Sequence, residues 1–342
     1  MKKIKLVLSV GIILLFLSFN IKEGNPFYIP ENWPKPVYNF EDNQLTRDKF
    51  ELGRTLFYDE SLSRDSTVSC ASCHLQYSGF THIDHALSHG IDGQIGNRNS
   101  PVLINLAWSS FFHWDGGVEN LDKQAINPLI HPKEMGNNLP EVIRRLNNSK
   151  FYKKRFLSAF GDSIITTSHL LHALSNFTLA LVSANSKYDL MKRGVAGSEF
   201  TDQEKSGYQL FLKNCNSCHT EPLFHSNAFK RNGLKIDEEL KDIGRMAITQ
   251  RKSDSMLFKV PTLRNIEFSF PYMHDGRFKK LKEVVDHYSS IPAHQLIVSK
   301  ELKKIKKSFS DEQKKDLIAF LKTLSDKQFL YNKDFMFPRN ER

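Results

Sequence analysis

The sequence predicts a mainly α-helical protein that consists of two similar halves connected by long loops. Helix signals recur along the chain, strand signals are sparse, and motifs of the first half return in the second half in the same order. The 342 residues are enough for two ordinary domains, each with an apolar core. With 40% hydrophobic and 25% charged residues, the composition is that of a folded globular protein, which excludes general disorder.

Helix-capping patterns locate three of the expected helices. The segments 201–204 (TDQE) and 310–313 (SDEQ) are capping boxes, in which two side chains bond free backbone N–H groups at a helix start. Ser168 is expected to cap a further helix, because apolar residues follow it at helical spacing up to residue 182. The segment 88–101, by contrast, is rich in Gly and Asn and is typical of a loop that wraps a cofactor.

All four cysteines occur in one five-residue pattern, Cys-x-x-Cys-His, which the chain contains twice. The residues are Cys70, Cys73 and His74, and then Cys215, Cys218 and His219. This pattern is the attachment signature of c-type haem: two thiols at this spacing can form thioethers with the vinyl groups of one porphyrin, and the adjacent His can bind the iron. The alternatives are a Cys₄ or Cys₂His₂ zinc site and a redox-active Cys-x-x-Cys pair. Two complete copies with no cysteine left over favour two covalently bound c-type haems.

The repetition extends beyond these motifs. GRTLF resembles GYQLF, PVLIN resembles PTLRN, and an Asp-Gly pair begins fourteen residues after the first residue of each of the latter two segments. A local motif would not preserve these offsets, so we interpret the pattern as a duplication. The matching segments are 53–57 and 207–211, 101–105 and 261–265, and Asp115-Gly116 and Asp275-Gly276.

We therefore predict a mainly α-helical fold of two cytochrome c-like haem domains related by duplication, with long loops and few strands. The N-terminal haem domain is expected over residues 21–195 and the C-terminal haem domain over residues 196–342. Their boundary is placed in the segment 192–200, where Gly and Ser follow one helix and precede the next capping box.

The first 20 residues indicate export. Lys2, Lys3 and Lys5 precede an apolar run from Val7 to Phe19, which is short for a membrane span and typical of a signal peptide over residues 1–20. An uncleaved membrane anchor is the alternative. Export through a signal peptide predicts a periplasmic protein.

The net charge of +10 does not predict nucleic-acid binding, because no basic stripe is interleaved with aromatic residues. A positive charge can steer an acidic protein partner towards the surface. The basic run KELKKIKK (300–307) is interpreted first as a solvated helix face and second as a contact for such a partner.

Motifs in order along the chain resemble the bacterial di-haem cytochrome c peroxidase and MauG family. They are LGRTLFYDESLS, SCASCH, SHG, RNSP, FHWDGG, EMGN, the second Cys-x-x-Cys-His and PTLRNIEFSFPYMHDG, and the resemblance covers residues 45–325. It implies a peroxidatic haem in the N-terminal domain and an electron-transfer haem in the C-terminal domain. It also implies reduction of hydrogen peroxide to water with electrons from a small c-type cytochrome or copper protein, and often a homodimer.

Two other functions stay open. The resemblance to MauG implies an oxidase that modifies a protein side chain, and a di-haem protein can also carry electrons without catalysis. A pure electron carrier needs neither an acid–base group nor a displaceable iron ligand, so these two features separate it from an enzyme.

The resemblance assigns three residues to the distal side of the first haem. His89, in a His-Gly pair, matches the distal iron ligand that leaves on activation, and His82 and His85 compete with it for that role. Glu134 resembles the acid–base group that moves a proton between the two peroxide oxygens. Gln124 resembles a glutamine of the distal pocket, although a surface position on a helix is an alternative.

Other residues are expected between the two haems. Trp114 resembles the tryptophan that the family places there, and in the second half the corresponding residue is His274. The family also holds a calcium ion between its domains. Asn99 matches the asparagine ligand of that ion, and Ser269 and Pro271 match the backbone carbonyl ligands.

The remaining axial ligands of the two haem irons are predicted by the same resemblance. His74 and His219 are the proximal ligands of the first and second haems. The distal ligand lies fourteen residues after the His of PYMHDG, and that residue is Tyr288, as in MauG, whereas peroxidases usually carry Met. A bound tyrosinate should lower the potential of the haem relative to Met. The alternative is that Tyr288 is a core aromatic residue and that either Met273 or no residue binds the iron on this side.

Overall fold

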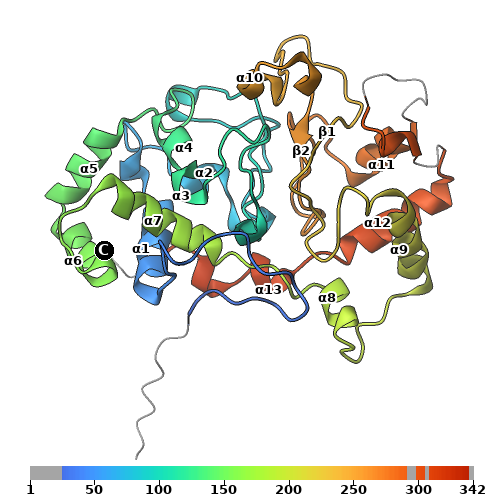
Figure 1. Ribbon diagram of the computed structural model, residues 1–342, viewed down its shortest axis with the longest axis horizontal. Coiled ribbons are helices and arrows are strands. Elements are labelled where there is room, and N and C mark those ends of the chain that lie inside the picture. Colours follow the sequence, from blue (N-terminus) through green and yellow to red (C-terminus); the bar gives the residue numbers. More distant parts are fainter. Residues whose placement is uncertain (1–24, 291–297, 305–307, 339–342) are drawn as a thin grey trace, which may run out of the picture.

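The computed structural model describes residues 25–290, 298–304 and 308–338, and it confirms the predicted mainly α-helical fold (Figure 1). Within these residues the only sheet has two short antiparallel strands, β1 (Phe229–Lys230) and β2 (Phe258–Lys259), in which Phe229 is opposite Lys259. None of the helices in the described ranges combines the length and the apolar character needed to cross a bilayer. The predicted signal peptide lies outside the described residues.

Helices of very different length make up the fold. In the first half they are α1 (Arg47–Phe57), α2 (Cys70–Cys73), α3 (Leu121–Gln124), α4 (Ile126–Ile130), α5 (Leu139–Asn148), α6 (Lys150–Phe160) and α7 (Thr167–Leu179). They continue with α8 (Lys187–Lys192), α9 (Asp202–Asn214), α10 (Met246–Thr249), α11 (Leu281–Ser290), α12 (Asp311–Lys322) and α13 (Lys327–Leu330). Single 3₁₀ turns are η1 (Glu60–Leu62), η2 (Gln76–Ser78), η3 (Ile91–Gly93), η4 (Leu106–Trp108), η5 (Lys252–Asp254), η6 (Leu302–Lys304) and η7 (Lys333–Phe335).

Two of the three predicted caps are confirmed and one is wrong. Thr201 and Ser310 cap α9 and α12 through complete capping boxes. The cap of α7 is Thr166, whose hydroxyl accepts a hydrogen bond from the backbone N–H of His169. Ser168 already lies inside the first turn of α7, where its own backbone is helical, so it cannot be the cap. The helix also ends at Leu179, before the apolar run does.

The same helix crossing occurs once in each half. Helix α1 packs along α7, and α9 packs along α12 (Figure 1). A Cβ atom at Gly53 of α1 would lie 1.9 Å from the carbonyl oxygen of Ala173. A Cβ atom at Gly207 of α9 would lie 1.9 Å from the carbonyl oxygen of Asp316. The glycine shared by GRTLF and GYQLF therefore permits the close approach of two helix backbones in each half.

The loops repeat as faithfully as the helices. Phe112 pairs with Val118 in an isolated bridge, and 160 residues later Tyr272 pairs with Phe278 in the same way. Positive φ angles recur at the same spacing, at Asn105 and Asn265 (57° and 58°), His113 and Met273 (64° and 77°), and Gly116 and Gly276 (68° and 65°). The backbone thus carries the duplication that the motifs predicted.

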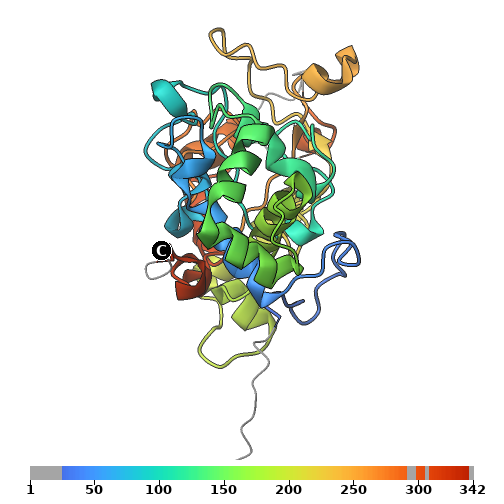
Figure 2. The ribbon, with the colours of Figure 1, turned by 90° about the vertical axis from the view of Figure 1, so that its left-hand side faces the viewer.

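Two clusters of buried apolar residues form the cores. The first is built from residues 45–184 and the second from residues 188–324. The chain then returns to the first half, because Phe329, Leu330 and Phe335 are buried in the first cluster. Figures 1 and 2 show α13 beneath the helices of the first half. The connection between α8 and α9 lies where the domain boundary was expected, and the division into two domains stays a prediction.

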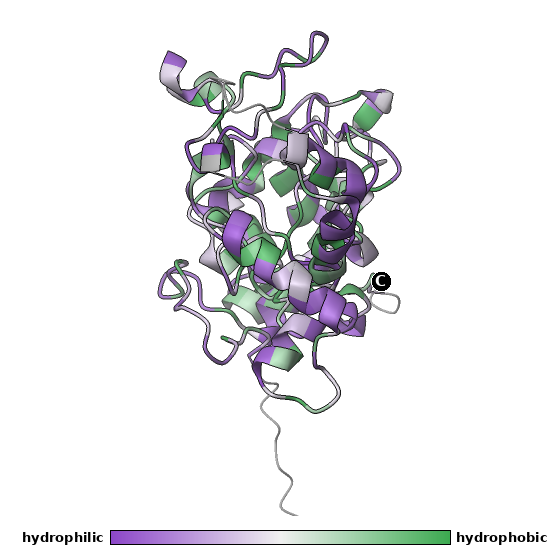
Figure 3. Cartoon of the chain, turned by 90° about the vertical axis from the view of Figure 1, so that its right-hand side faces the viewer, coloured by the Kyte–Doolittle hydropathy of each residue, from purple (hydrophilic) through white to green (hydrophobic). Residues whose placement is uncertain are grey.

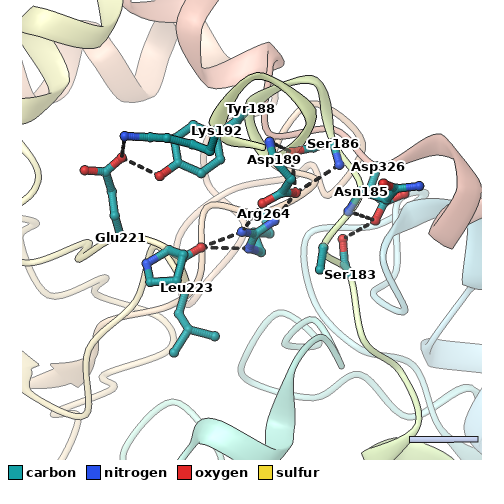
Figure 4. A network of polar contacts seen from close by, with 12 residues as sticks. Ser183, Asn185, Ser186, Tyr188, Asp189, Lys192, Glu221, Leu223, Arg264 and Asp326 are labelled. Atoms are coloured by element: carbon teal, nitrogen blue, oxygen red, sulfur yellow. Dashed lines mark hydrogen bonds and ion pairs between the residues drawn. The ribbon is translucent and has the colours of Figure 1, made fainter. Parts of the chain in front are cut away.

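A polar network fastens α8 to the loop that follows the second Cys-x-x-Cys-His motif (Figure 4). The side chain of Arg264 is fully buried and donates two hydrogen bonds of 2.8 Å to Asp189, and it also bonds the Pro222 carbonyl. Tyr188 donates to Glu221 over 2.5 Å. Because a buried guanidinium must be paired, this network selects one arrangement of the loop.

On the side of the second half, the helices carry both hydrophilic and hydrophobic residues, as expected for helices with one packed face (Figure 3).

Candidate haem sites and their surroundings

The first Cys-x-x-Cys-His motif forms helix α2 and the residue after it. The Nδ1 atom of His74 lies 2.7 Å from the carbonyl oxygen of Phe80, so Nδ1 carries the proton and donates. Burial lowers the pKa of His74 to about 4, which keeps the imidazole neutral. A neutral imidazole that donates from Nδ1 presents Nε2 to a metal, so His74 fits the role of an axial ligand.

The second motif has the same arrangement with one more acceptor. The Nδ1 atom of His219 lies 3.2 Å from the carbonyl oxygen of Phe224 and 3.1 Å from that of Pro261. Burial lowers the pKa of His219 to about 4 and raises the pKa of Cys215 to about 12. Burial likewise raises the pKa of the Cys70 thiol to about 12. These thiols are thus held in apolar surroundings that suit a porphyrin edge.

A zinc site does not fit the structure. The two motifs lie in different halves, and all four cysteines are free. Across the described ranges, no group of three or more His, Cys, Asp or Glu side chains is arranged to hold a metal ion. A cavity of about 230 Å³ instead extends beside the second motif, lined by Cys215, Cys218 and His219 and by many apolar side chains. The donor set and the apolar cavity fit a covalently attached haem.

The loop that carries His89 is held against the turn that carries Glu134. The backbone N–H of Ile91 donates to the Glu134 carbonyl over 2.8 Å. A Cβ atom at Gly90 would lie 2.1 Å from the Lys133 carbonyl oxygen, so only glycine allows this approach. The Cys73 thiol donates to the carbonyl oxygen of His89 over 3.3 Å. The SHG and EMGN motifs are therefore two sides of one contact beside the first haem motif.

Three histidines meet on this side. The ring centroids of His85 and His89 are 4.2 Å apart, and those of His82 and His85 are 5.3 Å apart. His82 is buried, whereas His85 is exposed. The structure brings the predicted ligand and both of its competitors together in one cluster, so the choice of His89 stays a prediction.

Glu134 lies close enough to the first motif for its charge to raise the pKa values of Cys70 and Cys73. Burial raises the pKa of Glu134 itself, and the nearby imidazole of His131, 3.8 Å away, opposes that shift. Its side chain is 41% exposed, which moderates the effect of burial. Gln124 ends α3, and its Nε2 atom lies 3.5 Å from Nε2 of His113, the residue before Trp114.

Trp114 and Asn99 join the two halves. The indole Nε1 of Trp114 donates to the carbonyl of Asn99 over 2.8 Å, and the Trp114 carbonyl accepts from the backbone N–H of Lys259 over 2.7 Å. The backbone N–H of Asn99 donates to the His274 carbonyl over 2.7 Å. His274 is buried and stacks on Phe258, with ring centroids 3.9 Å apart. The two residues that correspond in the duplication thus meet at Asn99.

The predicted calcium ligands border the same cavity as Trp114. Asn99, Ser269 and Pro271 all line it. The side-chain amide of Asn99 donates from Nδ2 to the Ala86 carbonyl over 3.0 Å. This orientation leaves the amide oxygen as the atom that a cation would use, and the calcium site stays a prediction.

The distal side of the second motif holds two candidates. Tyr288 in α11 and Met273 both line the cavity with His219. Burial raises the pKa of the Tyr288 phenol, and the thiols of Cys215 and Cys218 raise it further. His287 points elsewhere and hydrogen-bonds the Asn232 carbonyl through Nε2 over 2.8 Å. The Met273 sulfur lies 3.5 Å from Nδ2 of Asn232.

The motifs did not reveal the charged residues at the contact between the halves. Arg98 forms a two-point ion pair with Asp242, at 2.6 and 2.8 Å, and a second pair with Asp115. Arg98 and Asp115 stand in the RNSP and WDGG motifs, so their positions were a possible signal. Asp242 comes from a loop of the second half, and its partner could not be inferred without the fold.

Comparison with known proteins agrees with this geometry. A family model described as di-haem cytochrome c peroxidase matches residues 47–197. The methylamine utilization protein MauG of Methylophilus methylotrophus is 34% identical over 90% of this chain and 90% of its own length. The chain belongs to the di-haem cytochrome c peroxidase and MauG family. Membership in this family implies two c-type haems, one at each Cys-x-x-Cys-His motif.

Relatives of both functional types are similar to this chain. The cytochrome c551 peroxidase of Nitrosomonas europaea is 32% identical over 85% of the chain and 83% of its own length. The crystal structure of a MauG-like protein associated with microbial copper homeostasis superposes with a TM-score of 0.81 at 31% identity, covering 91% of this chain and 98% of that one. The di-haem peroxidase BthA of Burkholderia thailandensis, at 22% identity and a TM-score of 0.71 over 84% of this chain and 88% of that one, shares the fold.

Proposed function

We propose that this protein is a periplasmic di-haem cytochrome c peroxidase, which reduces hydrogen peroxide to water with electrons from a small c-type cytochrome or copper protein. The observation that carries the proposal is the position of Glu134. Its backbone is bonded to the loop of His89, its charge acts on the first pair of thiols, and burial raises its pKa. A plain electron carrier has no use for such a carboxyl group beside one haem.

In this proposal, His89 and Glu134 have different roles at the first haem site. When bound, a c-type haem supplies an iron that can bind peroxide and exchange single electrons. His89 moves away to open the distal side of the first site. Glu134 takes a proton from one peroxide oxygen and gives it to the other, so that the O–O bond breaks with loss of water. Two electrons and two protons in all convert each peroxide into two water molecules.

Electrons enter through the second half in this proposal. The indole of Trp114 donates to the Asn99 carbonyl, and its backbone carbonyl accepts from the Lys259 N–H, so ring and backbone are both held at the contact between the halves. A fixed aromatic ring in this position suits transfer between the two haems. We further propose that Asn99, Ser269 and Pro271 bind a calcium ion that secures this contact, and that the enzyme acts as a homodimer.

The test is steady-state oxidation of a reduced small c-type cytochrome by hydrogen peroxide. We expect fast turnover after the enzyme has been reduced by one electron, and slow turnover with the fully oxidised enzyme, because His89 must leave first. Equal rates in the two states would contradict the role of His89 as a gate.

A MauG-like oxidase of a protein side chain is the second candidate, and Tyr288 is the observation that favours it. This tyrosine lines the cavity of the second motif, where it would bind iron as tyrosinate and lower the haem potential. No turnover of the cytochrome in either state, together with a change of the haem absorption spectrum on addition of peroxide, would support this candidate against the peroxidase.

A further inference from the structure

Lys259 is a half-buried cation with no anionic partner among the described residues. It belongs to β2, lines the cavity beside the second haem motif, and is tied to Trp114 by its backbone N–H. Burial alone lowers the pKa of its ammonium group to about 8, and no neighbouring carboxylate counteracts the shift. An ammonium group in this position requires an anion to replace lost water.

The other cations near this cavity are already paired. Lys230, in the strand that faces β2, lies 2.7 Å from Glu301. Arg98 is paired with Asp115 and Asp242. Carboxylates of the protein therefore neutralise Lys230 and Arg98, whereas Lys259 is available to an anionic ligand.

His225 is a second polar side chain in this cavity that lacks a hydrogen-bond partner at one ring nitrogen. It is buried, it lines the cavity, and its Nε2 atom has no hydrogen-bond partner in the part of the chain that the structure describes. The positive charge of Lys259 acts directly on His225, so the two basic groups are neighbours. Buried polar atoms in native proteins are almost always bonded, so the unbonded Nε2 of His225 beside the ammonium group of Lys259 indicates a polar ligand at this place in the cavity. In the tautomer that carries its proton on Nε2, His225 donates to an acceptor.

The position of Lys259 along the cavity indicates which anion it meets. The charges of Lys230 and Glu301 act on Cys218, which places that pair at the cysteine end. Lys259 is joined to Trp114, at the contact between the halves. In a porphyrin bound through both vinyl groups, the two propionates leave from the edge opposite to the thioethers. A haem attached at these cysteines would direct its carboxylates away from them, and Lys259 would then be the cation available at the contact between the halves.

We propose that Lys259, assisted by His225, binds the carboxylate of a haem propionate at the contact between the two halves. Because the cavity contains Cys215, Cys218 and His219, the second haem is the expected source of this carboxylate. The ammonium group then neutralises negative charge close to the porphyrin and raises the potential of that haem. This effect opposes the lowering expected from Tyr288.

The proposal is tested by replacing Lys259 in the haem-loaded protein and measuring both haem potentials by spectroelectrochemical titration. We expect Lys259→Met to shift the reduction equilibrium of one haem about tenfold towards the oxidised state, which corresponds to about 59 mV for one electron. Lys259→Arg should keep the native potential, because the charge stays. His225→Phe should shift the same haem in the same direction by less.

Lys315→Met is the matched control, since Lys315 lies exposed on α12 with its side chain 66% exposed. If Lys259→Met assembles poorly, Lys259→Gln removes the charge and retains a polar side chain. Electron paramagnetic resonance separates the haems by their axial ligands. A shift at the second haem supports the proposal as stated, and a shift at the first haem supports propionate binding with that haem as the source. Potentials that match the control at both haems would overturn it.

This experiment uses no peroxide, and it depends on the two haems and not on the proposed peroxidase activity. A protein that lacks peroxidase turnover but shows the potential shift would disprove the proposed function and leave this inference intact.

Discussion

Trp114 in the first half and His274 in the second occupy the same place in the same loop, and both meet Asn99. Around them the backbones agree closely, with corresponding bridges and positive φ angles 160 residues apart. The side chains have diverged. The first half sets His89 and Glu134 beside its haem motif, whereas the second half sets Tyr288 and Met273 there.

The comparison separates the residues that maintain the architecture from those for which we propose a role in catalysis. The corresponding positions 53 and 207 are both glycine, because each permits the same close helix crossing. Glu134 differs from these glycines, because the role that we propose for it is in the reaction and not in packing. A duplicated fold can therefore keep its backbone contacts in both copies while the side chains beside each haem motif diverge.

The largest expected effect tests the chemistry of the first half. Glu134→Gln keeps the shape of the side chain but cannot take up a proton, so peroxidase turnover should fall about 10²- to 10⁴-fold. Turnover is measured with reduced cytochrome and peroxide, and haem content by absorption. Glu119→Gln, an exposed position in the same half, should leave turnover unchanged. Unchanged turnover in Glu134→Gln would remove the assignment.

The next effect tests whether the two halves are built alike. Gly53→Ala and Gly207→Ala each place a methyl group 1.9 Å from a backbone carbonyl oxygen. Each should lower the free energy of unfolding by about 3 kcal/mol, because the helices are forced apart. Denaturant titration measures the loss, and Lys213→Ala on the surface of α9 should change it by less than about 0.5 kcal/mol. Destabilisation in one half alone would break the structural parallel.

A smaller effect concerns pH. Burial raises the pKa of Glu134 above the usual value for a glutamate, which is about 4.3. On acidification, the carboxylate that accepts the first proton is therefore protonated at a higher pH than in an exposed glutamate. Turnover of the pre-reduced enzyme should therefore fall about tenfold per pH unit below that raised pKa. Glu134→Gln should lack this acidic limb. If the variant retains the limb with residual activity, another group controls it.

The smallest effect tests the helix starts. Thr166→Ala removes the cap of α7 and Thr201→Ala removes the cap of α9, so each should cost about 1 kcal/mol of unfolding free energy. Ser168→Ala, two residues into the same region, should cost less than about 0.5 kcal/mol. A larger loss at Ser168 than at Thr166 would reverse the assignment of the cap.

The sequence by itself determined the haem attachment, the helical fold and the duplication. These follow from local chemistry: a fixed spacing of thiols and imidazole, capping boxes, and offsets that two copies preserve. It misplaced the start and end of α7, because Thr166 competes with Ser168 as the cap and the buried apolar run outlasts the helix. It also took the segment 300–307 for a solvated helix face, whereas the described part contains the 3₁₀ turn η6 (Leu302–Lys304), and Glu301 is paired with Lys230.

Only the tertiary structure decided which distant residues meet. The contact of Gly90 with Lys133, the pairing of Arg98 with Asp242, and the return of Phe335 to the first core join segments that are far apart in the chain. It also left Lys259 without an anionic partner among the residues that the structure describes. Such pairings depend on burial and on the path of the whole chain, because a charge or a glycine has no preferred partner until the fold brings one within reach.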